Sequence, residues 1–90
     1  MQKSLSNVVK GAQPHTTIDV RDSMAPISLL KVENRLAQIS PGQTLEILCT
    51  GEETKSDLLD ITRNSKHRCI AVKKNKDHFK LLIEKHGLDA

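Results

Sequence analysis

Aromatic residues are almost missing from this chain of 90 residues. Phe79 is the single example, because the sequence contains no Trp and no Tyr. Binding modes that stack nucleic-acid bases or cage organic cations on aromatic rings are therefore largely excluded. The core must be aliphatic, and a chain of this length folds as one domain that buries roughly 60–65% of its unfolded surface.

Cysteine is scarce as well, and Cys49 and Cys69 are the two that occur. Two cysteines so far apart cannot form a disulfide framework or a zinc knuckle. The four histidines lack metal-ligand spacing with another His, Cys or carboxylate, so we expect no metal and no cofactor. No apolar run approaches the roughly 18 residues needed to span a bilayer, and no signal core is visible. These absences predict a protein of the reducing cytoplasm that does not contact membranes.

Positive charge is present in modest excess and is unevenly distributed. The formal net charge is +3, and the last 25 residues hold seven Lys or Arg against three Asp or Glu. A basic patch is predicted at Lys73, Lys74, Lys76 and Lys80. It is interpreted either as a solvated face or as a surface for an acidic partner or a nucleic acid.

The first half of the chain predicts a leader, a strand and a helix. Residues 1–15 are polar and broken by Gly11 and Pro14, which indicates a flexible leader. Alternation predicts a first strand over residues 16–20. Asp22 and Ser23 can cap a helix whose first turn holds Pro26. Seven residues predict one broad apolar stripe on that helix: Ile27, Leu29, Leu30, Val32, Leu36, Ala37 and Ile39.

The second half predicts a strand, a short helix and two further strands. The strand over residues 44–50 is followed by Thr54-x-x-Asp57, which resembles a capping box at the start of the helix. Residues 68–73 form an apolar third strand, and Phe79, Leu81 and Ile83 alternate in a fourth. The β-α-β-α-β-β order predicts an α/β fold, an α+β two-layer sandwich with two helices on one face of a four-stranded mixed sheet. We expect this domain to cover residues 16–86.

Several of these residues carry a resemblance to a known family. Asp19 and Arg21 end the first strand, Pro26 opens the first helix, and Pro41-Gly42 follows that helix. This pattern resembles the TusA/SirA-like sulfur carriers, in which Leu-Asp-x-Arg-Gly precedes a Cys-Pro-x-Pro motif. The resemblance implies the same two-layer fold and extends to Asp57 and His67, which match residues frequent in the family.

Departures from the family pattern fall at the chemical centre. Asp22 stands where the family has Gly, Ala25 occupies the cysteine position, and Ser28 replaces the second proline. A cysteine at a helix N-terminus has a lowered thiol pKa and can accept sulfane sulfur as a persulfide. Alanine has no atom for this step. Replacement at three positions together favours natural divergence over an engineered Cys→Ala change.

Two thiols elsewhere offer an alternative to the missing cysteine. Cys49 shares a face with Leu45 and Ile47, and Cys69 begins an apolar run. Because free Cys is among the most buried residue types, both are interpreted first as structural residues.

Three hypotheses about function follow. The first is a non-catalytic member of the family, expected as a monomer, that binds a sulfur-transfer enzyme or acceptor. Its docking loop and associated motif positions would be Asp19, Arg21, Ala25, Pro26, Asp57 and His67. The second is a persulfide carrier that uses Cys49 or Cys69. The third is an RNA-binding α/β domain that uses the basic patch, an analogy at the level of the fold alone.

Overall fold

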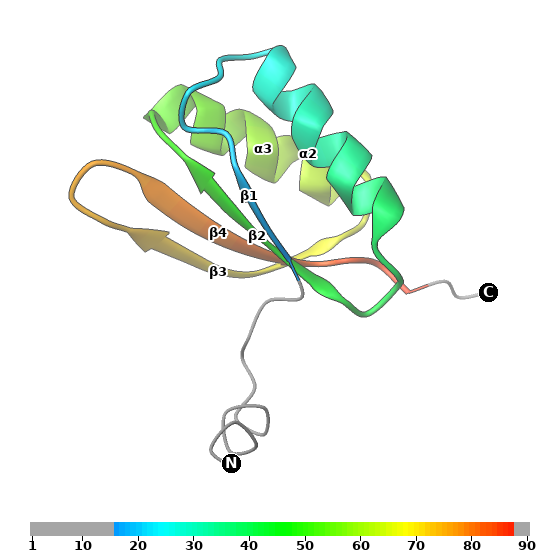
Figure 1. Ribbon diagram of the computed structural model, residues 1–90. Helices are drawn as coiled ribbons and strands as arrows, with labels where there is room; N and C mark the ends of the chain where they lie inside the picture. The colour runs from blue at the N-terminus through cyan, green and yellow to red at the C-terminus, as the bar shows by residue number, and fades with distance from the viewer. Residues whose placement is uncertain (1–15, 88–90) are drawn as a thin grey trace, which may run out of the picture.

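The computed structural model describes residues 16–87, so the predicted leader over residues 1–15 lies outside the described residues. The elements follow one another as β1 (Thr16–Asp19), α2 (Ile27–Gln38), β2 (Thr44–Cys49), α3 (Glu52–Asn64), β3 (Arg68–Lys74) and β4 (Phe79–Glu84). Both helices lie on the same face of the sheet (Figure 1). The predicted two-layer α+β fold is therefore confirmed. Neither described helix is both long and apolar enough to cross a bilayer.

The sheet is mixed, and its strand order is β1-β2-β4-β3. β1 runs parallel to β2, whereas β2 and β3 each pair with β4 in antiparallel fashion. Side chains of the two central strands alternate between fully buried and half-buried positions along their whole length. This alternation follows from the pleat, because one face of the strands meets the helices and the other face meets solvent.

The hydrophobic core lies between the helices and the sheet and is almost entirely aliphatic. Its buried residues are Ile18, Val20, Val32, Leu36, Ile39, Leu45, Ile47, Cys49, Leu58, Phe79, Leu81 and Ile83. The ring of Phe79 is the aromatic member, and the Lys55 ammonium lies 4.9 Å from its centroid. The core is therefore built from the alternating strand residues and one stripe from each helix.

The broad apolar stripe predicted for α2 is wrong in part. Val32 and Leu36 are buried as expected, but Ile27, Leu30 and Ala37 are exposed. At 100° per residue, Ile27 and Leu30 lie about 140° and 160° around the helix from Val32, so they cannot face the same sheet. The helix also begins at Ile27 with Pro26 at the N-cap and without a side-chain cap, so the predicted capping by Asp22 or Ser23 is wrong.

The predicted start of α3 is also wrong. The helix begins at Glu52, so Thr54 and Asp57 lie inside it and form no capping box. Gly51 is the N-cap residue with φ 92° and ψ 138°. This left-handed φ strains any residue with a Cβ, and it turns the chain into the helix immediately after β2. The carboxylates of Glu52 and Glu53 then occupy the first turn, where the helix dipole favours negative charge.

β3 is an edge strand, and all seven of its residues are exposed. The third strand predicted over residues 68–73 is present, but Cys69, interpreted first as a buried structural residue, is exposed, so that interpretation is wrong. The helices cover the central strands and leave the edge uncovered, so the apolar side chains Ile70 and Val72 remain 44% and 47% exposed. A β-bulge lies between Cys69 and Ala71.

Candidate functional site

The segment that joins β1 to α2, residues 20–26, holds the predicted motif positions Arg21, Ala25 and Pro26, and we call it the Ala25 loop; Asp19 ends β1 just before it. Its start is fixed to the sheet, because the Val20 N–H donates to the Leu48 carbonyl at 2.8 Å. Its second residue is fixed to the β2–α3 turn, since the Thr50 hydroxyl donates to the Arg21 carbonyl at 3.2 Å. The loop is thus held to β2 and to the turn after it at its first two residues.

Asp19 and Arg21 form the ion pair that their spacing suggested. The Arg21 guanidinium donates to both carboxylate oxygens, with Nε–Oδ1 2.9 Å and Nη2–Oδ2 2.8 Å. The Arg21 main-chain N–H adds a third bond of 3.0 Å to Oδ1. These hydrogen bonds lower the pKa of Asp19 to about 2. Both side chains are well exposed, so the pair shapes the turn more than it stabilises the fold.

Ala25 lies next to the N-terminus of α2 and is exposed. A cysteine there would present its sulfur to solvent beside the positive end of the helix dipole, which stabilises a thiolate. The alanine methyl group offers neither a nucleophile nor a titratable group. The loop therefore places a methyl group, and no nucleophile, beside the N-terminus of α2.

Three exposed apolar side chains lie within five residues of Ala25 in the sequence, and we call Met24, Ile27 and Leu30 the apolar patch. Their exposed fractions are 75%, 52% and 52%. The prediction from sequence placed Ile27 and Leu30 in the core and gave Met24 no role. Their angular positions on α2 could have predicted their exposure, because Ile27 and Leu30 project away from the stripe formed by Val32 and Leu36.

Ser28 occupies the core-facing position of the first turn of α2. Its side chain is fully buried, and its hydroxyl oxygen has no hydrogen-bond partner among the described residues. Its main-chain N–H donates to the Met24 carbonyl at 3.1 Å. A buried hydroxyl without a partner costs stability, so the first turn carries a defect directly behind the apolar patch.

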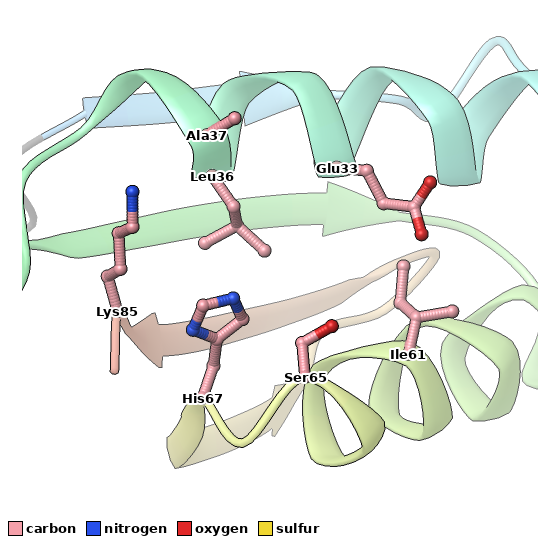
Figure 2. Close-up of a pocket in the computed structure, with 7 residues that line it drawn as sticks. All are labelled: Glu33, Leu36, Ala37, Ile61, Ser65, His67 and Lys85. Carbon is pink, nitrogen blue, oxygen red and sulfur yellow. The ribbon is translucent and has the colours of Figure 1, made fainter. Parts of the chain in front are cut away.

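His67 lines a groove at the opposite end of the helices. The groove measures about 250 Å³ and is bordered by Glu33, Leu36, Ala37, Ile61, Ser65, His67 and Lys85. Figure 2 shows the imidazole directed from the α3–β3 connection toward Leu36. The His86 main-chain N–H donates to Nδ1 at 2.9 Å, which leaves the proton of the neutral ring on Nε2. The pKa of His67 is lowered chiefly because burial disfavours the charged ring, and the positive charges of Lys85 and His86 act in the same direction.

The structure does not bring His67 to the Ala25 loop. Its groove is lined by Leu36 and Ala37 in the last turns of α2, whereas Ala25 precedes the first turn. A helix of this length separates its two ends by about 17 Å. Asp57 lies in the second turn of α3 and is half-buried. The predicted docking set therefore divides into a compact loop and two separate positions.

Neither cysteine resembles an activated thiol. Cys49 is fully buried at the end of β2, and burial raises its pKa. Cys69 is exposed on β3, yet partial burial of its sulfur also raises the pKa, and its thiol contacts the Ala71 carbonyl at 3.7 Å. Both shifts disfavour the thiolate that accepts sulfur.

The predicted basic patch lies on the β3–β4 hairpin but is only partly gathered. Lys73 and Lys80 face each other across the two strands. Lys80 also lies 3.7 Å from Glu46, and Lys74 lies over the ring of Phe79 at 5.8 Å. Lys76 is in the turn. The hairpin therefore carries positive charge on both sides rather than on a single face.

Comparison with known proteins gives three results. The profile of the family described as sulfurtransferase TusA matches residues 16–85. A candidate sulfur carrier protein of Archaeoglobus fulgidus is 26% identical over 68 residues, which cover 76% of this chain and 93% of that protein. The crystal structure of a SirA-like protein from Desulfitobacterium hafniense superposes with a TM-score of 0.70 at 16% identity, covering 80% of this chain and 99% of that one.

Proposed function

The chain belongs to the TusA sulfurtransferase family, and we propose that within this family it is a non-catalytic module that docks onto a protein of sulfur-transfer metabolism. One observation carries the proposal. The position beside the α2 N-terminus holds Ala25 and no thiol, yet three exposed apolar residues stand next to it in the loop and the first turn of α2. The chemistry is missing while a surface suited to protein contact remains.

The apolar patch has the character of an interface centre. Burying one large aliphatic side chain contributes about 1.5–3 kcal/mol relative to leaving it exposed. Met24, Ile27 and Leu30 therefore offer a favourable contribution on binding, and the anchored Ala25 loop loses little conformational freedom when a partner docks. Because a few residues near the centre of an interface carry most of its binding energy, these three side chains are the ones to substitute first.

The partner proposed is a sulfur-transfer enzyme or acceptor, and the compartment proposed is the reducing cytoplasm, in which both free cysteines stay reduced. In this role the module would occupy the docking site of a sulfur-carrying relative without accepting sulfur. The raised pKa values of Cys49 and Cys69 support a role without sulfur transfer. Cys69 is nevertheless exposed, so persulfide transfer through this thiol is the second candidate.

The test is titration of the isotope-labelled protein with a cysteine desulfurase, read by amide chemical shifts. We expect the perturbed amides to lie in residues 21–31. Ile27→Asp should weaken binding at least about tenfold, since a charge would be buried in an apolar contact.

Ala37→Asp is the matched control, because Ala37 is an exposed apolar residue at the other end of the same helix. We expect this control to leave the affinity unchanged. Equal losses for the two variants, or perturbations centred away from the Ala25 loop, would contradict the proposed docking surface.

A further inference from the structure

The two edges of the sheet differ in how they meet solvent. β1 is short, and the Arg35 guanidinium lies against it, donating to the Thr17 carbonyl at 3.4 Å and the Thr16 hydroxyl at 3.3 Å. β3 has seven residues, all exposed, and among the described strands it pairs only with β4. The β3 edge is therefore the longer and more open of the two.

The hairpin register shows which main-chain groups of β3 point outward. The Asn75 N–H donates to the His78 carbonyl at 2.8 Å, which makes these two residues a hydrogen-bonded pair. Hydrogen-bonded and non-hydrogen-bonded pairs alternate along an antiparallel ladder. From this pair the register runs back through Lys74, Lys73 and Val72, so Lys74 and Val72 occupy non-hydrogen-bonded pairs. Their N–H and C=O groups are directed away from β4 and are open to another strand.

The side chains of this edge combine apolar and basic character. Ile70 and Val72 are 44% and 47% exposed, and Lys73, Lys74 and Lys76 follow them at the hairpin end. Lys73 faces Lys80 directly across the strands. Like charges in that position are destabilising, and among the described lysines Glu46 lies 3.7 Å from Lys80 only, so a negative charge beside Lys73 would stabilise the hairpin.

Lysines and bulges on an edge strand commonly protect it from self-association. That function accounts for the charges here, because an antiparallel pair of two copies centred on Ala71 would place Arg68 against Lys74. It does not account for two exposed β-branched side chains on the same strand. The same lysines that repel a second copy would attract an acidic segment.

We propose that β3 is a docking edge for an extended, acidic segment of another protein, which adds to the sheet as a neighbouring strand. Its main chain would pair with the outward groups of Val72 and Lys74. Its apolar residues would cover Ile70 and Val72, while its carboxylates would lie against the lysines of the hairpin. This recognition uses main-chain hydrogen bonds for affinity and side chains for selectivity. The proposal does not rest on the docking function of the Ala25 loop.

The test uses a capped peptide with a Val-Thr-Val-Thr core and two Glu residues at each end. Added to the isotope-labelled full chain, it should shift the amides of residues 68–76 and slow hydrogen exchange at Val72 and Lys74. The same peptide with Lys in place of Glu should bind at least about tenfold more weakly. A peptide N-methylated at alternate residues should lose binding, because it cannot form the strand ladder.

Val72→Pro removes an outward N–H that the β3–β4 ladder does not use, and proline is tolerated at such an edge position. We expect it to abolish binding of the acidic peptide, and Lys73→Glu to weaken it at least about tenfold. The N-methylated peptide also tests whether binding depends on main-chain hydrogen bonds, and it does so without a substitution in the protein. Equal binding of the acidic and basic peptides, or no binding of the acidic one, would overturn the proposal. A single-stranded oligoribonucleotide provides a second comparison. If it binds the same lysines with the same affinity in the native chain and in Val72→Pro, while the acidic peptide does not bind the native chain, the proposal is overturned in favour of nucleic acid.

Discussion

Replacing Ser28 by alanine should stabilise the protein. The Ser28 side chain is fully buried and its hydroxyl oxygen has no partner in the described part of the chain. An unpaired buried hydroxyl costs about 1–3 kcal/mol, because it loses its hydrogen bonds to water without replacement. Alanine also has a helix propensity about 0.5 kcal/mol better than that of serine. Ser28→Ala should therefore raise the free energy of unfolding by about 1–3 kcal/mol after allowance for the small volume removed.

Ser56→Ala is the matched control for this substitution. Ser56 lies inside α3 and is exposed, so its hydroxyl remains hydrated. The control should show only the propensity gain of about 0.5 kcal/mol. Urea unfolding of the three proteins measures the difference, and thermal unfolding should raise Tm by about 4–8 °C for each kcal/mol. If Ser28→Ala is no more stable than Ser56→Ala, the hydroxyl has a partner and the reasoning about this turn is refuted.

Three further predictions concern the core, the thiols and the Asp19 carboxylate. In urea unfolding, Leu36→Ala should lower the free energy of unfolding by about 2–5 kcal/mol. Leu30→Ala should change it by less than about 1 kcal/mol, because Leu30 is half exposed. Equal losses for the two variants would contradict the orientation of α2. Under native conditions a thiol reagent should label Cys69 first and the buried Cys49 only on unfolding; two fast thiols would contradict the burial of Cys49. The folded pKa of Asp19, about 2, lies below its ordinary value of 3.8, so its contribution to stability is present above pH 4 and is lost as the pH falls toward 2. A carboxyl NMR titration should show this midpoint, and an unshifted midpoint would contradict the Arg21 contact.

Local patterns in the sequence predict most of the fold. Alternation in residues 44–49 and 79–84 identifies the two central strands, because one face of each is covered and the other is not. Apolar spacing placed Val32 and Leu36 correctly in the buried stripe of α2, but it also included Ile27, Leu30 and Ala37, which are exposed. The start of α3 was missed because Gly51 adopts a left-handed φ, a conformation that composition permits but does not require.

The exposure of β3 could not be predicted from its own residues. Position at the edge or centre of a sheet depends on strand order, which is a property of the whole fold. An apolar run therefore indicates a strand without showing which of its faces is covered. For the same reason Cys69 was expected inside and lies outside.

The candidate site was predicted in part. Arg21, Ala25 and Pro26 are neighbours in sequence and Asp19 ends the strand before them, so their proximity followed directly. His67 matched a family position, yet its groove lies at the far end of α2. The apolar patch could be predicted only from the angular positions of its residues on α2. Ile27 and Leu30 are apolar, and only these positions show that they face solvent.

The most direct test of the central claim is the intact mass of the protein after incubation with a cysteine desulfurase and cysteine. We predict no gain for the native chain, because Ala25 has no thiol and the pKa values of Cys49 and Cys69 are raised. Ala25→Cys, the matched variant, should gain about 32 Da, the mass of one sulfur atom, and lose it on reduction. A reducible gain of about 32 Da on the native chain that disappears in Cys69→Ser would contradict the account and make Cys69 a persulfide carrier.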